Sequence, residues 1–478
     1  MEHINTFLEG FANILSGYVL VALVLAVGIL LTIKLKWIQI FRLPKALKYM
    51  VKNEDGGQGD VSSFGALCTA LSATIGTGNI VGVATAVSQG GPGALFWMTV
   101  ASFFGLATKY TEGMLAVKYR VFSKSGAQGG PFFYIENGMG KKWKWLAVLF
   151  AVFGVTAGLF GIGTITQISG ITTAAGDFFD PDKAHIAFSL AGRPYSCAVV
   201  ISGALVTVSA AVVLIGGVKR IAKFSEFVVP FMAGIYLTAC TVIICSRIVE
   251  LPSAVMMIVK AAFDPKAVTG GAVGSVMIAV QKGIARGIFS NESGLGSAPI
   301  AIASAKSKDH VRQGLVAMTG TYDTMIICAL TGLAIVMTGT WNKGLEGVEI
   351  TAQAFRIGLP FIPAISALLL MISLSFFAFT SILGWNYYSE RCLQYLIGEK
   401  PTALKIYKWA YILIVFIGPY LTVSFVWKIA DICSALMALP NLVGLLALSG
   451  FAAKETSEYF KKDKIQDAEN APRKVVRY

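Results

Sequence analysis

The sequence is poor in the side chains that enzymes use most for acid–base and metal chemistry. Only three of its 478 residues are histidine, and they lie at the N-terminus or between long apolar stretches: His3, His185 and His310. Its seven cysteines are scattered without a Cys-x-x-Cys pair, so we interpret them as small packing residues. The chain also lacks a P-loop motif. These absences disfavour an enzyme, a resident cofactor and transport driven by ATP within this chain.

Charged residues are scarce too, at 14%, whereas 55% of the residues are hydrophobic and the mean hydropathy is +0.69. A soluble globular chain rarely has this composition. Because a hydrocarbon core about 30 Å thick needs roughly 20 apolar residues per helix, the sequence predicts an all-α membrane protein with about eleven transmembrane helices. They are expected over residues 12–33, 64–89, 92–117, 145–174, 196–217, 227–247, 271–304, 313–339, 360–389, 405–426 and 429–452.

The basic residues are distributed unevenly over the segments between these stretches. The net charge is +14, and most of the 40 Lys and Arg residues follow an odd-numbered stretch. The positive-inside rule therefore predicts a multi-pass protein of the cell membrane, with its N-terminus outside and its C-terminus in the cytoplasm. The basic tail, residues 454–478, is expected to bind anionic lipid and not nucleic acid.

Two of the apolar stretches are interrupted at mid-depth by a Gly-x-Gly pair. The first is ALSATIGTGNIVGVATAV, residues 70–87, and the second is GIFSNESGLGSAPIAIASA, residues 287–305. Each interruption lies about half a bilayer, roughly 15 Å of helix, from a predicted helix end. Because they fall in the second and the seventh stretch, they run in opposite directions. Such a pair of interrupted segments indicates a secondary transporter built from inverted repeats.

The chain is therefore expected to have four parts. Residues 1–60 form an N-terminal transmembrane helix and a basic cytoplasmic loop, residues 61–250 and 251–453 form two five-helix repeats, and residues 454–478 form the tail. A short extra helix is expected over residues 265–282, because the run before the second interruption is about twice as long as half a bilayer requires.

An interrupted helix leaves main-chain groups without helical partners. They must face protein, water or a ligand, because in lipid each of them costs several kcal/mol. Around Gly76, Thr77 and Gly78 the amides suit a carboxylate, whereas the carbonyls from Ser72 to Ile75 suit a cation. A single Gly-x-Gly is more often a site of close helix packing. Two matched interruptions with polar neighbours favour a binding site instead.

Three segments of the chain are similar to blocks of the sodium:alanine (alanine or glycine:cation) symporter family. They are GGPGALFWMTVASFFGLATKYTEGMLAVKYR (residues 90–120), GGPFFYIENGMG (129–140) and RGIFSNESGLGSAPIAIASAK (286–306). The resemblance covers essentially the whole membrane region. It implies a LeuT-like 5+5 inverted repeat with one extra N-terminal helix. It also implies symport of a small neutral amino acid with a monovalent cation, usually sodium.

The resemblance also implies a set of binding residues. The amino acid would bind at the two interruptions and at a glutamine of the fourth stretch: Thr74, Gly76, Thr77, Gly78, Asn79, Gln167, Phe289, Ser290 and Asn291. Sodium, as the co-transported ion, would bind main-chain and hydroxyl oxygens: Ser72, Ile75, Phe377, Thr380 and Ser381. Taken alone, the last two hydroxyls would equally well bond to their own helix, and the glutamine would serve to hold helices together. Ser169 stands where the family often has asparagine, which keeps glutamine open as an alternative substrate.

Two acidic residues inside the apolar stretches have more than one interpretation. An intramembrane carboxylate such as Glu292 is functional by default. We favour a structural role for it, either as the partner of Arg286 or as a cap of the half-helix that starts at Gly294. Asp323 is either a cation or proton relay or a buried, hydrogen-bonded acid.

Three further polar or aromatic residues are expected to have ordinary roles at least as readily as functional ones. Lys109 and Glu112 lie three positions apart near the inner end of the third stretch, where snorkelling or mutual pairing is favoured over transport chemistry. Trp385, one turn beyond Ser381, either closes the site from the cytoplasmic side or simply packs.

The sequence thus predicts a secondary active symporter that couples the uptake of a small neutral amino acid to sodium entry by alternating access. Alanine or glycine is the expected substrate, with glutamine as an alternative. The competing hypotheses are a proton-coupled amino-acid symporter, with Glu292 or Asp323 as carrier, and a passive facilitator or channel. The expected partners are the amino acid, sodium and the lipid bilayer.

Overall fold

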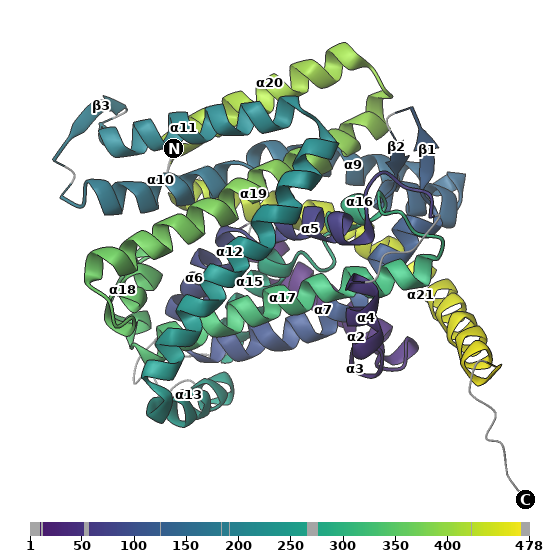
Figure 1. Cartoon of the computed structure of the whole chain (residues 1–478), viewed down its shortest axis with the longest axis horizontal. Helices are drawn as coiled ribbons and strands as arrows, with labels where there is room; N and C mark the ends of the chain where they lie inside the picture. Colours follow the sequence, from purple (N-terminus) through teal and green to yellow (C-terminus); the bar gives the residue numbers. More distant parts are fainter. Residues whose placement is uncertain are drawn as a thin grey trace, which may run out of the picture.

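A computed structural model describes residues 10, 13–51, 57–124, 126–182, 184–190, 192–264, 276–421 and 423–469. The described chain is predominantly helical, as Figure 1 shows, and the predicted helical membrane fold is confirmed. Two short antiparallel hairpins, which the sequence did not predict, join helices: β1 (Val121–Ser123) with β2 (Gly126–Gln128), and β3 (Ile186–Leu190) with β4 (Arg193–Ser196).

The helices follow one another along the chain with short connections. In order they are α2 (Leu20–Lys34), α3 (Ile38–Phe41), α4 (Leu43–Val51), α5 (Ser63–Thr74), α6 (Val81–Gly90), α7 (Gly93–Lys118), α8 (Pro131–Phe133), α9 (Lys144–Phe160), α10 (Ile165–Phe179), α11 (Cys197–Ile215), α12 (Val218–Ser246), α13 (Leu251–Phe263), α15 (Val276–Asn291), α16 (Ala298–Ile302), α17 (His310–Met337), α18 (Val348–Gly358), α19 (Pro363–Ile397), α20 (Pro401–Ile417) and α21 (Val423–Glu469).

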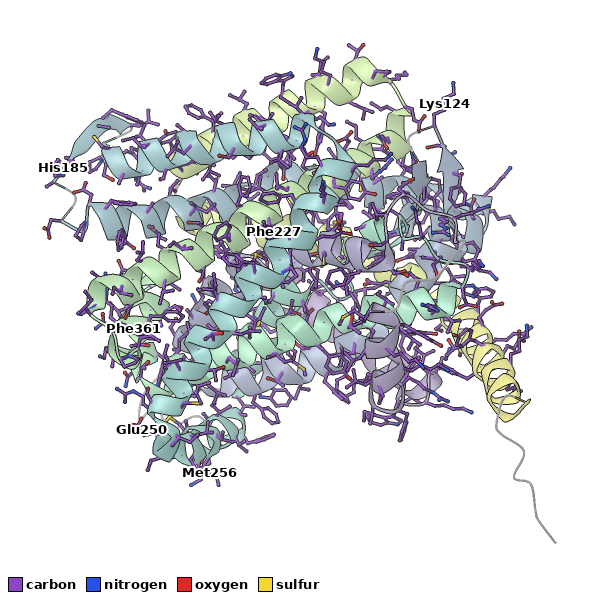
Figure 2. All side chains as sticks on the ribbon, viewed as in Figure 1. Lys124, His185, Phe227, Glu250, Met256 and Phe361 are labelled. Atoms are coloured by element: carbon purple, nitrogen blue, oxygen red, sulfur yellow. The ribbon has the colours of Figure 1, made fainter. Side chains whose placement is uncertain are left out.

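Within the described ranges, eight helical stretches are long and apolar enough to cross a membrane, or nine if the bent pair α5–α6 is one span. The 26-residue helix α7 is also long enough, at about 39 Å. The predicted count of eleven and the inverted repeat are compatible with this arrangement and stay predictions. Large apolar side chains cover the outside, and Phe227, Met256 and Phe361 in Figure 2 are between 48% and 74% exposed.

Both predicted interruptions are confirmed. The axis bends by 65° between α5 and the segment Thr77–Gly90, which begins with a 3₁₀ turn over Thr77–Asn79. The second span stops at Asn291 and resumes at Ala298. Three residues between these helix ends have left-handed backbone angles: Glu292 (φ 54°), Gly294 (φ 89°) and Gly296 (φ 78°). Glycine adopts this conformation without strain, whereas a glutamate requires support from its surroundings.

Three boundaries differ from the sequence predictions. The stretch 145–174 is two helices, α9 and α10, because the chain turns at Gly161 and Gly163. The extra helix expected over 265–282 is wrong where it can be compared: residues 276–282 begin α15, and 265–275 lie outside the described residues. The short helix that precedes the second interrupted span is α13 instead. Finally, α21 does not end at 452 but continues to Glu469 and projects from the bundle (Figure 1).

At the end of the bundle where α5 begins, Arg120 joins the ends of the two interrupted spans. Its guanidinium donates to the carbonyls of Ala303, Ala305, Gln58 and Ser307 at 2.7–3.0 Å. The segment before α5 also pairs with the segment after α16, through bridges from 58 to 307 and from 61 to 305. The two interrupted spans are therefore fastened to each other at this end.

Candidate functional site

The first interruption is supported by two side-chain amides. Asn79 Oδ1 accepts from Gly76 N at 3.1 Å, and Gln167 Oε1 accepts from Thr77 N at 3.0 Å. Gln167 also donates to the carbonyl of Ile162, which the turn between α9 and α10 leaves without a helical partner, at 2.8 Å. Both side chains, predicted as substrate ligands, thus hold the unwound main chain.

Two polar groups at the first interruption have no protein partner within the described part of the chain. The Thr77 hydroxyl is fully buried and makes no hydrogen bond. No acceptor is bonded to Gly78 N either. Because buried polar groups are nearly always satisfied, these two donors are available to an acidic ligand.

The oxygens predicted to bind sodium lie where α5 meets α19. Gly76 N and Thr77 N, bonded to side chains, no longer serve the carbonyls of Ser72 and Ala73, their ordinary helical acceptors. The Ser381 hydroxyl donates to the carbonyl of Ile75 at 3.3 Å, and the Thr380 hydroxyl donates to the carbonyl of Phe377 at 3.0 Å. The five oxygens assigned to sodium therefore come from two helices in direct contact.

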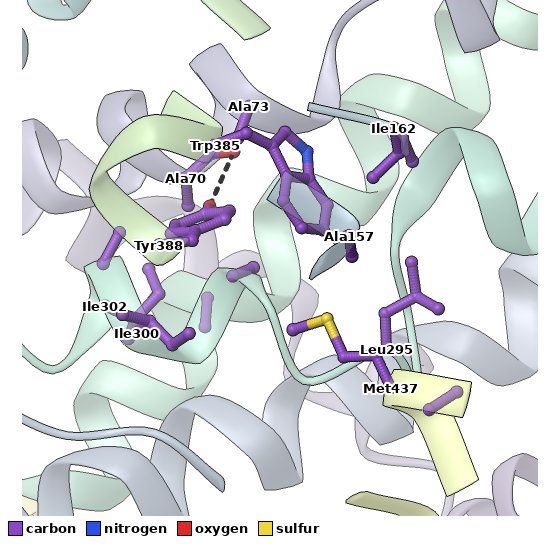
Figure 3. Packing of buried hydrophobic residues seen from close by; sticks show 14 of the residues in the cluster. Ala70, Ala73, Ala157, Ile162, Leu295, Ile300, Ile302, Trp385, Tyr388 and Met437 are labelled. Carbon is purple, nitrogen blue, oxygen red and sulfur yellow. Dashed lines mark hydrogen bonds between the residues drawn. The ribbon is translucent and has the colours of Figure 1, made fainter. Parts of the chain in front are cut away.

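This contact between α5 and α19 depends on glycine. A Cβ on Gly384 would lie 2.8 Å from Ala73 N and 2.9 Å from Ala73 Cα. Figure 3 shows the same contact one turn on, where Trp385 and Tyr388 lie beside Ala70 and Ala73, and the Tyr388 hydroxyl donates to the Ala70 carbonyl at 3.4 Å. The two helices therefore approach closely, and oxygens of both, Ser381 Oγ and Ile75 O, lie 3.3 Å apart.

The second interruption leaves two carbonyls without helical donors. Ser293 N, which would serve Phe289 O in a continuous helix, donates to Asn291 Oδ1 at 3.0 Å. Gly294 N, which would serve Ser290 O, donates to Glu112 at 3.1 Å. The Asn291 carbonyl accepts from Lys109, and its side chain donates to Ser102, each at 2.9 Å. Of the three residues predicted to meet an ammonium group, Phe289 and Ser290 keep this option, and Asn291 is committed to protein contacts.

The structure brings the two interruptions together. A Cβ on Gly78 would lie 3.0 Å from the Phe289 ring and 3.3 Å from Ser290 Cα. Asn79 and Ser290 also bond to one atom, Cys328 Sγ in α17, at 3.5 and 2.9 Å. All the non-glycine residues predicted for substrate or sodium are at most 5% exposed. Sequence reasoning missed Cys328, because a lone helical cysteine carries no signal of its own.

The whole sequence, compared with known proteins, matches the model of the sodium:alanine symporter family over residues 1–473. The chain belongs to the sodium:alanine symporter family. The resemblance of its three segments to that family is thereby confirmed, and the family and its relatives are transporters and not enzymes.

The relatives of this family member span nearly its whole length. It is 41% identical over 478 residues to the sodium/alanine symporter AgcS of Methanococcus maripaludis, covering 98% of each chain. It is 50% identical over 466 residues to an uncharacterized transporter of Haemophilus influenzae, covering 97% of each. The probable sodium/glutamine symporter GlnT of Bacillus subtilis is 31% identical over 468 residues, covering 97% of this chain and 92% of that one.

The fold is similar to that of MhsT, solved in complex with L-phenylalanine. The TM-score is 0.55, and the match covers 85% of this chain and 99% of MhsT at 13% identity. At this identity the likeness establishes the fold alone, and it confirms the predicted LeuT-like architecture for this member of the sodium:alanine symporter family.

The prediction that Lys109 and Glu112 snorkel near a helix end is wrong for this family member, whereas the predicted interaction between their charges is present. Both side chains are buried, at 4% and 0% exposure, and both bind the second interruption. Glu112 Oε1 accepts from Gly294 N, Gly296 N and Asn441 Nδ2 at 3.1, 3.2 and 2.7 Å. Spacing alone placed the pair on one face of α7, and only the packing of α7 against α15 determines what that face contacts.

Glu292 has a structural setting, but with other partners than predicted. Its carboxylate accepts from the Ser297 hydroxyl at 2.5 Å and from Trp385 Nε1 at 2.9 Å, so it joins the second interruption to α19. Arg286 pairs instead with Asp431 of α21 at 3.0 Å. The cap of Gly294 that was predicted for Glu292 is supplied by Glu112. The side chain of Asp323, the other predicted relay, lies outside the described residues.

Proposed function

We propose that this protein is a secondary active symporter that couples uptake of a small neutral amino acid, alanine or glycine in the first place, to sodium entry. The observation that supports it most is the meeting of two interrupted spans, at Gly78 and Phe289, with unpaired main-chain groups on both. Relatives carry the names sodium/alanine and probable sodium/glutamine symporter, so glutamine is kept as an alternative substrate.

The carboxylate of the amino acid binds at the first interruption. Gly78 N and the Thr77 hydroxyl have no protein partner within the described residues, and they lie on adjacent residues. Gly76 N and Thr77 N can join them only if the substrate displaces the oxygens of Asn79 and Gln167. Hydrogen bonds to an ionised acceptor are about twice as strong as neutral ones, which favours a carboxylate at this position.

The ammonium group binds the carbonyls of Phe289 and Ser290 in the second interruption. The close approach of Gly78 to the Phe289 ring leaves little room between the two spans, which favours a small side chain on the substrate. No carboxylate is needed to balance the substrate, because a neutral amino acid carries its own. Thr74 lies at the end of α5, and Gln167 keeps the first interruption in shape.

Sodium binds the carbonyl oxygens of Ser72, Ile75 and Phe377 together with the hydroxyl oxygens of Thr380 and Ser381. In the structure these hydroxyl hydrogens point to carbonyls of the same set, and a cation can take their place between the oxygens. Hard cations prefer such oxygen ligands. A set without carboxylates suits a monovalent ion better than a divalent one.

The available gradients are sufficient for uptake by alternating access. One charge that crosses about 100 mV releases roughly 2.3 kcal/mol, and a tenfold sodium gradient adds about 1.4 kcal/mol. With one sodium per amino acid, the total of about 3.7 kcal/mol supports roughly 500-fold accumulation. The basic loops orient the chain in the cell membrane with the N-terminus outside and the C-terminus in the cytoplasm.

The test is uptake of labelled alanine, glycine and glutamine into proteoliposomes with an inward sodium gradient, with potassium in its place as control. We expect concentrative uptake of alanine or glycine with sodium only. Uptake that persists without sodium and follows an inward pH gradient would support proton coupling. Uptake that never exceeds equilibration would support a passive facilitator.

A further inference from the structure

The unwound segment of the second span is held by side chains from two other helices. Glu112 of α7 accepts from Gly294 N and Gly296 N, and Asn441 of α21 donates both to Glu112 at 2.7 Å and to the Gly294 carbonyl at 2.9 Å. The Tyr134 hydroxyl donates to Asn441 Oδ1, which fixes the orientation of that amide. Both main-chain groups of Gly294 are therefore engaged outside their own helix.

We propose that Glu112, oriented by Asn441, keeps the second span unwound and thereby keeps the carbonyl of Ser290 free for the ammonium group of the substrate. This proposal rests on the proposed function. Glu112 touches Gly294 and not the ammonium site, so it is a positioning residue for amino-acid binding.

The alternative conformation that Glu112 prevents is a longer α15. In a continuous helix Gly294 N donates to Ser290 O, four residues earlier. A buried N–H that loses its acceptor costs free energy until it finds another. Without Glu112, the acceptor available along the chain is Ser290 O itself. Rewinding would also release Glu292 from its left-handed backbone angle, which disfavours the unwound state by itself.

Lys109 restricts the same site from the other side. Its ammonium donates at 2.9 Å to the carbonyl of Asn291, the C-terminal residue of α15. A cation at the C-terminal end of a helix is also favoured by the helix dipole. The substrate ammonium is thus left with the carbonyls of Phe289 and Ser290, the two residues before Asn291.

The experiment compares a substrate that has an ammonium group with one that lacks it. In proteoliposomes one measures the KM of alanine, the Ki of L-lactate as a competitor, and the sodium concentration for half-maximal uptake. The variants are Glu112→Ala, Glu112→Gln and Asn441→Ala. The control is Thr111→Ala, the neighbour of Glu112 on α7, whose hydroxyl donates only to its own helix at Ala107 O.

We expect Glu112→Ala to raise the KM of alanine about tenfold or more, with the lactate Ki and the sodium requirement changed less than threefold. Glu112→Gln should be intermediate, because its carbonyl keeps one acceptor but its amide replaces Oε2, a buried atom without a partner in the described structure. Asn441→Ala should follow the same pattern more weakly, and Thr111→Ala should match the wild type.

Two results would overturn the proposal: equal losses of alanine and lactate affinity, or an unchanged alanine KM in folded Glu112→Ala or Glu112→Gln protein. If Glu112→Ala does not reach the membrane, Glu112→Gln and Asn441→Ala decide. Failure of the proposed function is visible separately, since wild-type protein would then show no sodium-driven uptake. In that case thermal stabilisation of the purified protein by each amino acid and its hydroxy-acid analogue replaces the uptake assay for the same variants.

Discussion

Substituting Gly384 by alanine should separate the two halves of the proposed sodium site. The added Cβ would lie 2.8 Å from Ala73 N and 2.6 Å from Ala73 Cβ, against at least 3.4 Å for an ordinary contact. The obstructing atoms belong largely to the main chain of α5, so α19 must move away by about 0.6 to 0.8 Å. Metal ligands generally tolerate displacements of about 0.2 Å. The 3.3 Å distance from Ser381 Oγ to Ile75 O would then approach about 4 Å.

Overpacking of this size costs about 1 to 3 kcal/mol. If this cost falls on the sodium-bound state, the sodium concentration for half-maximal alanine uptake should rise about 5- to 150-fold. The assay is a sodium titration of uptake in proteoliposomes, with thermal stability in detergent measured in parallel. Gly234→Ala in α12 is the matched control, since nothing lies within 4 Å of its added Cβ and alanine favours a helix. A sodium requirement within twofold of wild type in well-folded Gly384→Ala protein would refute the reasoning.

Three more predictions follow from the site and from the fastening at Arg120. Thr380→Ala combined with Ser381→Ala should raise the sodium requirement about tenfold or more; an unchanged requirement would remove both hydroxyls from the ion site. Sodium at 100 times its dissociation constant should stabilise the purified protein by about 2.7 kcal/mol, seen as a higher Tm than in potassium, and equal Tm values in the two salts would contradict a sodium site. A lysine at position 120 cannot bond to four carbonyls, so Arg120→Lys should loosen the start of α5, and Cys68 of α5, 1% exposed, should react with a maleimide about tenfold faster. Arg220→Lys is the control, because that arginine donates to one carbonyl of α11. Equal labelling rates in the two variants would show that Arg120 does not hold α5 in place.

The sequence predicts the two interruptions because two Gly-x-Gly pairs with polar neighbours lie at matching positions of two apolar stretches. Gly76 lies at the predicted bend, and Gly294 and Gly296 adopt a left-handed conformation that glycine tolerates best. The turn between α9 and α10 escaped prediction although it also has a Gly-x-Gly, Gly161 and Gly163. A single Gly-x-Gly is more often a site of close helix packing, and this pair was not matched with a second one, so it did not predict a break.

The partners of the buried charges could not be predicted in the same way. Arg286 and Glu292 lie six residues apart in one segment, yet Arg286 pairs with Asp431, and Glu292 bonds to Trp385. These contacts join segments separated by more than 90 residues, and they depend on which parts of α19 and α21 the second interrupted span meets. Periodicity describes one helix at a time. It therefore placed Lys109 and Glu112 on one face of a helix, but it did not show that this face contacts the second interruption.

The 65° bend at the first interruption has a mechanical consequence. Two helical segments that meet at such an angle can change their relative orientation at the residues that join them, here the main chain of Ile75 and Gly76. A ligand that binds the main-chain atoms of Ile75 and Gly76 therefore changes how easily this connection bends. If ligands bind as proposed, their binding and the angle between α5 and the segment Thr77–Gly90 depend on the same few peptide groups.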